Sequence, residues 1–298
     1  MLDAIKKDFK NKDDITGYLE RPTDSLFWIL EEPHHLTYLG QRKYYSLYLA
    51  ASLLRPQHKA LVKFIQPHWL NYHRIRQKFM DESQLLRSLH GPGFPQWITS
   101  GRFHEQPYFC YAWPEGKLLS SHLTERDLFP LSTLRSVGLF IVAQLLQRLV
   151  YLHERINPLA HGEINVDNIL LDTQQKVHIV DFSCSYFIHT RMQKNIHWTG
   201  ASAYLSPEQA QGKPWECPSD IYQLGILCYE WFTGQRWNRG KTTQERKRFA
   251  ASAHLPRADF LVSQGLSPSL SALVAAMLNP VAEKRPSAIW LQQQLKDY

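Results

Sequence analysis

The sequence has few cysteines, and none of them is paired at a metal-binding or disulfide-like spacing. The four cysteines show no CxxC pair and no regular interval, and the fourteen histidines include no HExxH. Zinc modules and small secreted scaffolds depend on such patterns, so neither is expected here. We therefore predict reduced thiols and no structural zinc.

Long hydrophobic runs are also missing. The best candidate, residues 136–152, is interrupted by Gln144, Gln147 and Arg148, which favours a buried helix over a membrane span. The first residues, MLDAIKKDFKNKDD, are charged throughout and lack the apolar centre of a secretory signal. The sequence therefore predicts a cytoplasmic protein without a membrane span.

Positive charge exceeds negative charge, with a formal net charge of +7, but it is not concentrated. The one basic cluster is KTTQERKR, residues 241–248, and such a cluster is more often a solvated face than a nucleic-acid footprint. We expect no nucleic-acid partner. The net charge is compatible with an acidic ligand such as a nucleotide or a phosphoprotein.

The hydrophobic periodicity changes along the 298 residues. Residues 1–33 are polar and predict an N-terminal extension. Residues 34–113 are strand-rich with one helical segment, and residues 114–298 are mainly helical with two short strands, NILLD and KVHIVDF. The pattern predicts an α+β fold of two lobes, a small strand-rich lobe with one helix and a larger helical lobe. The strand-like runs of the first lobe are LTYL, YSLYLA, ALVKFI, QWITSG and PYFCYAW.

Two charged residues of the strand-rich lobe stand in apolar surroundings. Lys63 lies inside the run ALVKFI, and Glu82 lies on the helical stripe formed by Ile75, Phe79 and Leu86. An unpaired charge in a core costs several kcal/mol, so a Lys63–Glu82 pair would satisfy both residues. Taken alone, the two residues also allow each side chain to extend independently into solvent.

The helical lobe contains a second unusual segment, SDIYQLGILCYEWFT, residues 219–233. It begins with a good helix N-cap, Ser219, and then has almost no polar face. A helix of this kind is predicted to be surrounded by protein.

Taken in order, these pieces and the stretch HGEINVDN resemble the eukaryotic-type (Hanks-type) serine/threonine protein kinase domain, from about Leu36 to the C-terminus. Lys63 and Glu82 match its strand lysine and helix glutamate. HGEINVDN matches the catalytic loop H-R-D-x-x-x-x-N, and Asp181-Phe182-Ser183 matches D-F-G. Further matches are YLSPEQA for the A-P-E end of the activation segment, Asp220 as the brace of the catalytic loop, and Glu208 with Arg285 as an internal ion pair.

The resemblance implies a bilobal kinase fold, with a small antiparallel β-sheet lobe plus one helix and a larger, mainly α-helical lobe. It also implies a protein that uses ATP and Mg²⁺ and acts on a protein substrate or partner. Asn168 and Asp181 would hold the metal, because Mg²⁺ prefers hard oxygen ligands. Lys63, held by Glu82, would neutralise the phosphates, and all these groups would bind one metal–triphosphate. The nucleotide would further contact Gly40, Leu47, Leu61, Tyr111, Trp113 and Leu170.

The sequence departs from the family at the nucleotide. In the stretch GQRKYY, Arg42 and Tyr45 replace the second and third glycines of the phosphate-covering loop G-x-G-x-x-G. Bulkier residues are expected to distort this loop or hold it away from phosphate. Leu61 replaces a smaller residue in the adenine pocket and narrows it, and Ser183 replaces the D-F-G glycine.

It departs further at the acceptor side. Glu163 stands where the family has the aspartate that accepts the proton of the acceptor hydroxyl. Its extra methylene moves the carboxylate by about 1 Å or more, and such a displacement can lower the rate by about 10²-fold. Gly162, Asn165 and Ala201 replace the family's arginine, lysine and threonine. Control by phosphorylation of the activation segment is therefore expected less than in many members of the family. His161 is expected to pack on Phe182 rather than to act as an acid or base.

Three functions follow from these matches and departures. The first is a serine/threonine protein kinase of attenuated activity. The second is a pseudokinase, inactive because Glu163 replaces the aspartate, which acts as a nucleotide-binding or scaffold module. The third is a small-molecule kinase of the aminoglycoside or choline type, against which YLSPEQA, SDIYQLG and KRPSA argue.

Overall fold

The computed structural model describes residues 27–125, 130–188, 201–252, 254–256 and 258–297. The chain forms two compact units, the first ending at Lys117 and the second beginning at Leu118. The predicted fold class is confirmed, because the first unit is an antiparallel sheet with one α-helix among its described residues and the second is mainly helical. The division lies slightly later than the boundary at residues 113–114 expected from the sequence.

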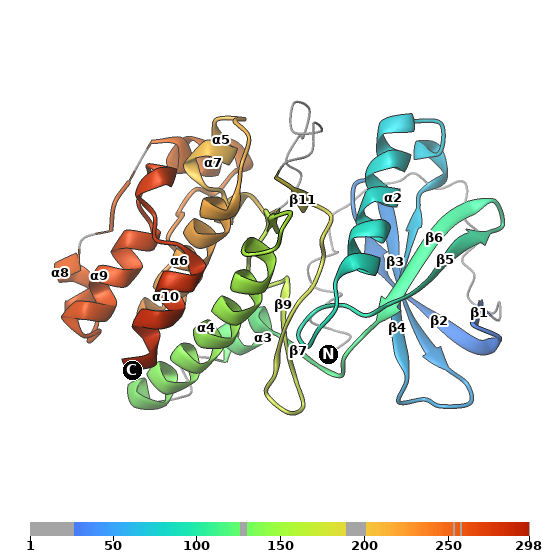
Figure 1. Cartoon of the computed structure of the whole chain (residues 1–298), viewed down its shortest axis with the longest axis horizontal. Helices are drawn as coiled ribbons and strands as arrows, with labels where there is room; N and C mark the ends of the chain where they lie inside the picture. The colour runs from blue at the N-terminus through green and yellow to red at the C-terminus, as the bar shows by residue number, and fades with distance from the viewer. Residues whose placement is uncertain (1–26, 126–129, 189–200, 253, 257, 298) are drawn as a thin grey trace. The chain divides into compact units, whose positions relative to one another are not determined.

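The first unit is built on a six-stranded sheet in the order β1-β2-β3-β4-β6-β5, and each neighbouring pair is antiparallel (Figure 1). The five strand-like runs of the sequence all appear in it. The elements are β1 (Phe27–Ile29), β2 (Glu32–Gln41), β3 (Tyr45–Ser52), β4 (Lys59–Ile65), β5 (Trp97–Phe103) and β6 (Gln106–Ala112), with η1 (Pro67–Trp69) and α2 (His73–Ser88) after β4.

The sheet begins inside the segment that the sequence assigned to the N-terminal extension. Strand β1 and the first residues of β2 occupy residues 27–33, and Phe27 and Ile29 are buried in a core cluster with Val62 and Phe64. A tight turn at Leu30 and Glu31, with φ of 47° and 66°, folds β1 back onto β2. So short a strand leaves no periodic signal, and only its partners bury it. Residues 1–26 of the predicted extension lie outside the described residues.

The two faces of this sheet have different roles. Ala60, Val62 and Phe64 of β4 point into the core cluster that also contains the β1 side chains. Because successive residues of a strand point to opposite faces, Leu61 and Lys63 point the other way. Glu82 and Phe79, on the buried stripe of α2, are on the side of Lys63, since Glu82 binds Lys63 and Phe79 packs against Phe109, the register partner of Lys63.

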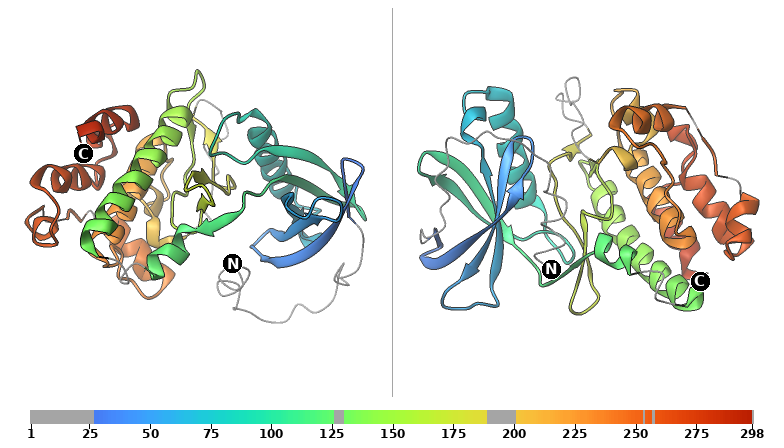
Figure 2. Two further views of the ribbon diagram at one scale, coloured as in Figure 1. Left: turned by 90° about the horizontal axis from the view of Figure 1, so that it is seen from below. Right: turned by 180° about the vertical axis from the view of Figure 1, so that it is seen from behind.

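The second unit is organised around helix α6 (Cys217–Thr233), whose residues 219–233 are all buried, as the sequence predicted. Helix α4 (Leu131–His153) packs against both α6 and α10 (Ala288–Gln294) (Figures 1 and 2). The other helices and turns are α3 (Leu119–Thr124), α4 (Leu131–His153), α5 (Pro207–Ala210), α7 (Thr243–Ala251), α8 (Ala258–Ser263), α9 (Pro268–Met277), α10 (Ala288–Gln294), η4 (Ser202–Tyr204), η5 (Ala282–Lys284) and η6 (Leu295–Asp297).

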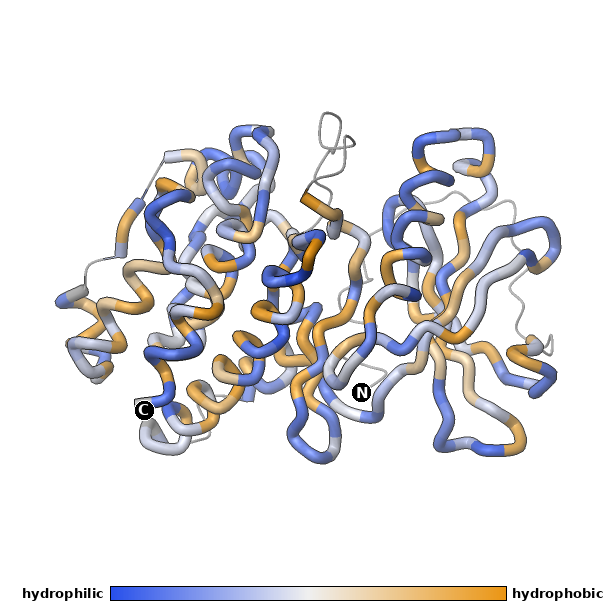
Figure 3. The backbone as a smooth tube through the Cα atoms, in the orientation of Figure 1, coloured by the Kyte–Doolittle hydropathy of each residue, from blue (hydrophilic) through white to orange (hydrophobic). Residues whose placement is uncertain are grey.

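Short strands position the loops of the candidate site. Strands β9 (Ile169–Asp172) and β10 (Val177–Ile179) form an antiparallel hairpin with a hydrophilic turn (Figure 3). Strand β8 (Leu159–Ala160) pairs with β11 (Tyr186–Phe187), so the segments that flank residues 161–185 are tied together. Strand β7 (Gly116–Leu118) contains the division between the units.

Helix α4 is the apolar segment that the sequence interpreted as a buried helix. Among the described residues, Ser132–His153 is the helix that is long and apolar enough to cross a membrane by length and composition. Its side chains Ile141, Leu145 and Leu149 are almost fully buried in the second unit.

Candidate active site

The buried charges of the first unit form an ion pair. Lys63 Nζ lies 2.6 Å from Glu82 Oε1, and the two side chains are only 1% and 4% exposed. This confirms the paired alternative over independent extension into solvent. The pair joins β4 to α2 and fixes the ammonium group, because a buried cation without its carboxylate would cost several kcal/mol.

Two aromatic rings also lie near the Lys63 ammonium group. Its Nζ lies 4.6 Å from the centroid of the Tyr45 ring and 5.9 Å from that of Phe109, within range of cation–π attraction. Tyr45 is the residue at the position of the family's third glycine. The sequence identified Tyr45 as too bulky for a loop that approaches phosphate, but gave no sign that its ring would lie over the lysine.

The loop that contains Tyr45 is a tight hairpin held in place. Arg42 N donates to Tyr45 O at 2.8 Å, and Gln66 Nε2 donates to Arg42 O at 2.7 Å. Gln66 N donates to Tyr44 O at 3.0 Å, and Gln66 Nε2 also contacts Tyr45 O. Gln66, the residue after β4, therefore holds three residues of the hairpin in place. Gly40, with φ of 149°, lies at the register shift of β2, a conformation that side chains rarely adopt.

The predicted adenine-pocket residues of the first unit share one face of the sheet. Leu47 is the register partner of both Gly40 and Lys63, and Leu61 is the partner of Tyr111. Since directly opposed residues point to the same face, these side chains surround the lysine face of β4. Trp113 follows β6, and its N–H donates to Lys59 O at 2.8 Å.

In the second unit, Asp220 braces the loop 161–168, as the resemblance implied. Its carboxylate accepts hydrogen bonds from the backbone N–H groups of His161 at 2.9 Å and Gly162 at 2.7 Å, and it lies 2.9 Å from His153 Nε2. The His161 ring packs edge-on against Phe182 at 4.7 Å between centroids, which confirms its expected packing role.

Glu163 has a specific partner that the sequence did not reveal. Its Oε1 accepts a hydrogen bond of 2.6 Å from the backbone N–H of Ala201, and the side chain is buried. Ala201 is the position where the family has threonine. The longer side chain of Glu163 therefore reaches the backbone of the segment that precedes η4, and ties the loop 161–168 to it.

The two asparagines of this loop have different roles. Asn165 is buried and uses its Oδ1 to accept from Asp167 N at 2.8 Å, so it supports the turn as a structural residue. Asn168 donates through Nδ2 to Glu163 O at 3.0 Å, which orients its amide. Its Oδ1 accepts no hydrogen bond from the described residues, and this is the atom that suits a hard cation.

Asp181 lies next to Asn168. It directly follows Val180, whose N–H donates to Asn168 O at 2.9 Å, and its own Oδ1 accepts from Ser183 N at 3.2 Å. Its φ of 61° is a left-handed conformation that a non-glycine residue adopts at a cost, and such positions cluster at functional sites. Among the described residues no group of three or more His, Cys, Asp or Glu side chains could hold a metal. The carboxylate of Asp181 and the amide oxygen of Asn168 fit Mg²⁺, which binds through one or two protein ligands and keeps several waters.

Gly162, at the position of the family's arginine, is required by its surroundings. Its φ is 78°, and a Cβ there would lie 2.5 Å from Trp215 Nε1 and 2.7 Å from Cys184 O. Trp215 packs edge-on against Tyr186 at 5.5 Å, and burial raises the pKa of the Tyr186 phenol. Trp215 thus packs where the side chain of the family's arginine would begin. The sequence alone showed only that this arginine is missing.

The predicted Glu208–Arg285 ion pair is also present. Arg285 Nη1 and Nη2 lie 2.7 and 2.9 Å from the two carboxylate oxygens of Glu208. Burial alone would raise the pKa of Glu208, but the hydrogen bonds and charge of Arg285, together with a hydrogen bond from Ser219, hold it below its ordinary value. Leu170, the predicted residue beneath the adenine, is fully buried on β9 opposite His178.

Comparison with known proteins agrees with this geometry. Residues 36–296 match the model of the protein kinase domain. The chain is 27% identical to the serine/threonine-protein kinase PrkC of Bacillus subtilis, over 64% of this chain and 28% of that protein. It is likewise 27% identical to the serine/threonine-protein kinase Nek8 of Danio rerio, over 69% of this chain and 28% of the relative. The matched part thus spans less than a third of these relatives. The match to the protein kinase domain favours a protein kinase over the small-molecule kinase alternative. This chain belongs to the protein kinase domain family.

Proposed function

We propose that this protein is an ATP- and Mg²⁺-dependent serine/threonine kinase that transfers phosphate slowly to a protein acceptor. The observation that carries the proposal is the buried Lys63–Glu82 pair, 2.6 Å long and almost fully excluded from solvent. A fixed ammonium group of this kind supplies the positive charge that phosphoryl transfer requires.

The described residues divide the work in the following way. Lys63 binds the phosphates of the nucleotide and is held in place by Glu82. Asn168, through its Oδ1, and Asp181, through its carboxylate, would hold one Mg²⁺, and the bond from Val180 N to Asn168 O keeps the two residues together. When bound, the metal neutralises charge on the transferring phosphate. Leu47, Leu61, Tyr111 and Leu170 provide apolar contacts for the base.

Attenuation is attributed to Glu163. It carries the charge of a general base, which contributes about 10²–10⁴-fold in favourable cases. Its Oε1, however, already accepts from Ala201 N, and its reach differs from that of aspartate. Asn165 is engaged in its own turn and supplies no cation to the acceptor side.

A pseudokinase is the second candidate, and two observations favour it. The Tyr45 ring lies over the Lys63 ammonium group, where a phosphate would also bind. Glu163 serves as a backbone anchor for Ala201. If Tyr45 does not move aside, the lysine is a structural charge and the protein acts as a scaffold.

Thermal unfolding tests nucleotide binding, which the kinase requires and a nucleotide-free scaffold lacks. We expect Mg²⁺ and ATP together to raise the melting temperature, since a ligand at 100 times its Kd stabilises by about 2.7 kcal/mol. Asp181→Ala should abolish the rise, and Glu283→Ala, a change at an exposed residue, should preserve it. Tyr45→Ala should enlarge the rise if the ring obstructs phosphate. No rise in the wild type or in Tyr45→Ala would overturn the kinase proposal.

Transfer is tested with radiolabelled ATP and a generic protein acceptor. The wild type should label the acceptor slowly and Lys63→Met should not label it. Nucleotide-dependent stabilisation with equal background labelling in both proteins would establish the pseudokinase. Hydrolysis of the labelled acceptor identifies phosphoserine or phosphothreonine, and phosphotyrosine alone would contradict the serine/threonine assignment.

A cytoplasmic location and a protein partner are further parts of the proposal. The four cysteines are free thiols, which suits a reducing compartment. Recovery of the protein in the soluble cytosolic fraction would support this location, and recovery in the membrane fraction would contradict it.

A further inference from the structure

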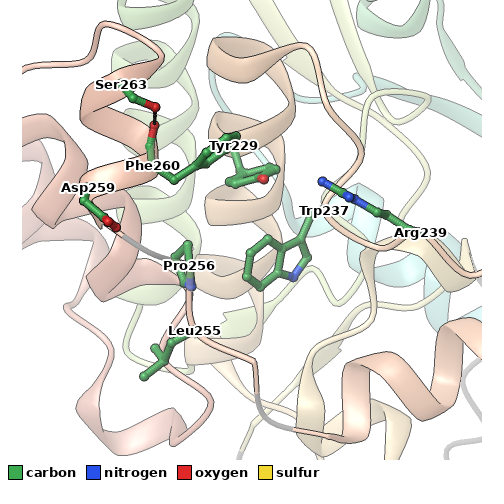
Figure 4. Close-up of a pocket in the computed structure, with 8 residues that line it drawn as sticks. All are labelled: Tyr229, Trp237, Arg239, Leu255, Pro256, Asp259, Phe260 and Ser263. Carbon is green, nitrogen blue, oxygen red and sulfur yellow. Dashed lines mark hydrogen bonds between the residues drawn. The ribbon is translucent and has the colours of Figure 1, made fainter.

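A cavity of about 510 Å³ lies in the second unit, and none of its lining residues belongs to the candidate active site (Figure 4). It is formed by the C-terminal part of α6, the connection from α6 to α7, Leu255 and Pro256 before α8, and α8 itself. Its size falls in the range of roughly 300–1,000 Å³ that is typical of ligand sites.

The floor of the cavity is aromatic and fixed. Tyr229 contacts Trp237 edge-on at 5.0 Å and Phe260 in a stacked arrangement at 6.2 Å. Trp237 donates its backbone N–H to Glu230 Oε1 at 3.2 Å and its indole N–H to Tyr222 OH at 3.3 Å. Because both donors of Trp237 are satisfied within the protein, it presents apolar ring surface that needs no ordering when a ligand binds.

The rim of the cavity leaves apolar surface in solvent. Leu255 is 58% exposed, and Pro256 beside it is half-buried. A preformed aromatic floor with an exposed aliphatic rim suits a single large apolar side chain, the kind of anchor that dominates peptide and protein interfaces.

Charge around the cavity is polarised. Arg239 and Asp259 lie on opposite sides of the aromatic group (Figure 4). The segment 236–248, which continues from the cavity wall into α7, carries six cations and one acid, Glu245; of the cations, Arg236 is paired with Glu230. Arg239, Lys247 and Arg248 of this segment are exposed. The positive charge therefore extends beyond the cavity itself.

We propose that this cavity is a docking site for an acidic peptide segment of a protein partner. One large apolar side chain of the segment enters between Leu255 and the aromatic floor, and its carboxylates face Arg239 and α7. The proposal does not depend on phosphoryl transfer, and applies equally to an active kinase and to a scaffold.

Fluorescence anisotropy with the full chain tests it. The probe is the fluorescein-labelled peptide Asp-Glu-Asp-Phe-Leu-Asp-Glu-Asp. One control replaces Phe-Leu by Gly-Gly, and another replaces every acid by lysine. We expect the probe to bind at least about tenfold more tightly than either control, a factor that corresponds to about 1.4 kcal/mol. Equal binding of the Gly-Gly peptide would show attraction by charge alone and overturn the proposal.

Surface variants locate the binding. Leu255→Glu and Arg239→Glu should each weaken probe binding by about tenfold or more. Ile156→Glu and Lys284→Glu make the same kinds of change at other exposed positions of the second unit and should have no effect. All four residues are exposed, so the variants are expected to fold, and unchanged melting temperatures verify this. Equal effects in the two pairs would refute the site.

A photo-crosslink gives an independent location. A benzophenone amino acid in place of the probe phenylalanine should attach to residues that line the cavity, in the tryptic fragments that contain Tyr229, Trp237, Leu255 or Phe260. Attachment elsewhere in the chain would place the peptide outside this cavity.

Discussion

Shortening Glu163 by one methylene tests both roles of this residue at once. In Glu163→Asp the carboxylate retracts by about 1.5 Å, one carbon–carbon bond. The 2.6 Å contact to Ala201 N would then lengthen to about 4 Å, beyond hydrogen-bonding range. A hydrogen bond to a charged group contributes about 1.5–3 kcal/mol, so the free energy of unfolding should fall by about that amount.

The same change should raise the rate of phosphoryl transfer. It gives the carboxylate the length that the family uses for its general base, and a misplacement of about 1 Å can account for about 10²-fold in rate. Glu163→Asp is therefore expected to be less stable and faster than the wild type. Stability is measured by urea unfolding at neutral pH, and rate by labelling of the generic acceptor.

The control is Glu163→Gln, which keeps the length and an acceptor oxygen for Ala201 N but removes the charge. It should lose less than about 1.5 kcal/mol of stability, because the hydrogen bond becomes a neutral one. It should also label the acceptor more slowly than the wild type by about 10²-fold or more, because the base is gone. If Glu163→Asp unfolds like the wild type, the Ala201 anchor is refuted. If both variants label as the wild type does, Glu163 is not the base.

Three further predictions concern the residues that hold the site together. Glu82→Gln leaves the Lys63 ammonium group buried without its carboxylate and should lower the free energy of unfolding by about 3–5 kcal/mol. The control Glu105→Gln breaks an exposed pair with Arg102 and should lower it by about 1 kcal/mol or less. Equal urea midpoints of the two variants would contradict the burial of the Lys63–Glu82 pair. Gly162→Ala should destabilise the protein more than Gly212→Ala. Both glycines have a positive φ, which costs alanine about 1–2 kcal/mol, but only at Gly162 would the added Cβ also collide with Trp215 and Cys184. Equal losses of unfolding free energy in calorimetry would refute the steric argument. Glu208→Gln should be less stable than the wild type at neutral pH, and this difference should shrink in acid. Because the pKa of Glu208 is lowered in the folded protein, its contribution to stability is complete above the ordinary pKa near 4.5 and is lost as the pH falls through the folded-state pKa. A stability difference that does not change between about pH 7 and pH 3 would show that the ion pair with Arg285 does not form.

Local patterns allowed much of this site to be predicted. The lysine inside ALVKFI and the acid on the stripe of α2 each contradict their surroundings, and the cost of a lone buried charge made the pairing one of two alternatives. The apolar circumference of residues 219–233 predicted a helix enclosed by protein, which α6 is. The roles of Asp220, Glu208 and Arg285 came from resemblance to a family, and the structure places their hydrogen bonds accordingly.

Other features had no local signal. Strand β1 is too short to show a period and is recognised only because Phe27 and Ile29 lie in a core with β4. The Tyr45 ring over Lys63 and the bond from Ala201 N to Glu163 join residues 18 and 38 positions apart, and nothing in either segment indicates which distant residue it contacts. Trp215 beside Gly162 is a further example, since its indole replaces an expected side chain with packing.

The sequence by itself determined which chemical groups are present and where they stand along the chain: a lysine, two acids and an amide in the order of a phosphotransferase, with glutamate in place of the usual base. Spacing and periodicity are properties of the chain, so they could be read without coordinates. The tertiary structure decided how those groups are engaged, with Tyr45 over the lysine, Glu163 on the backbone of Ala201 and Trp215 against Gly162. Contacts of this kind form when segments distant in the sequence pack together, and packing is a property of the folded core.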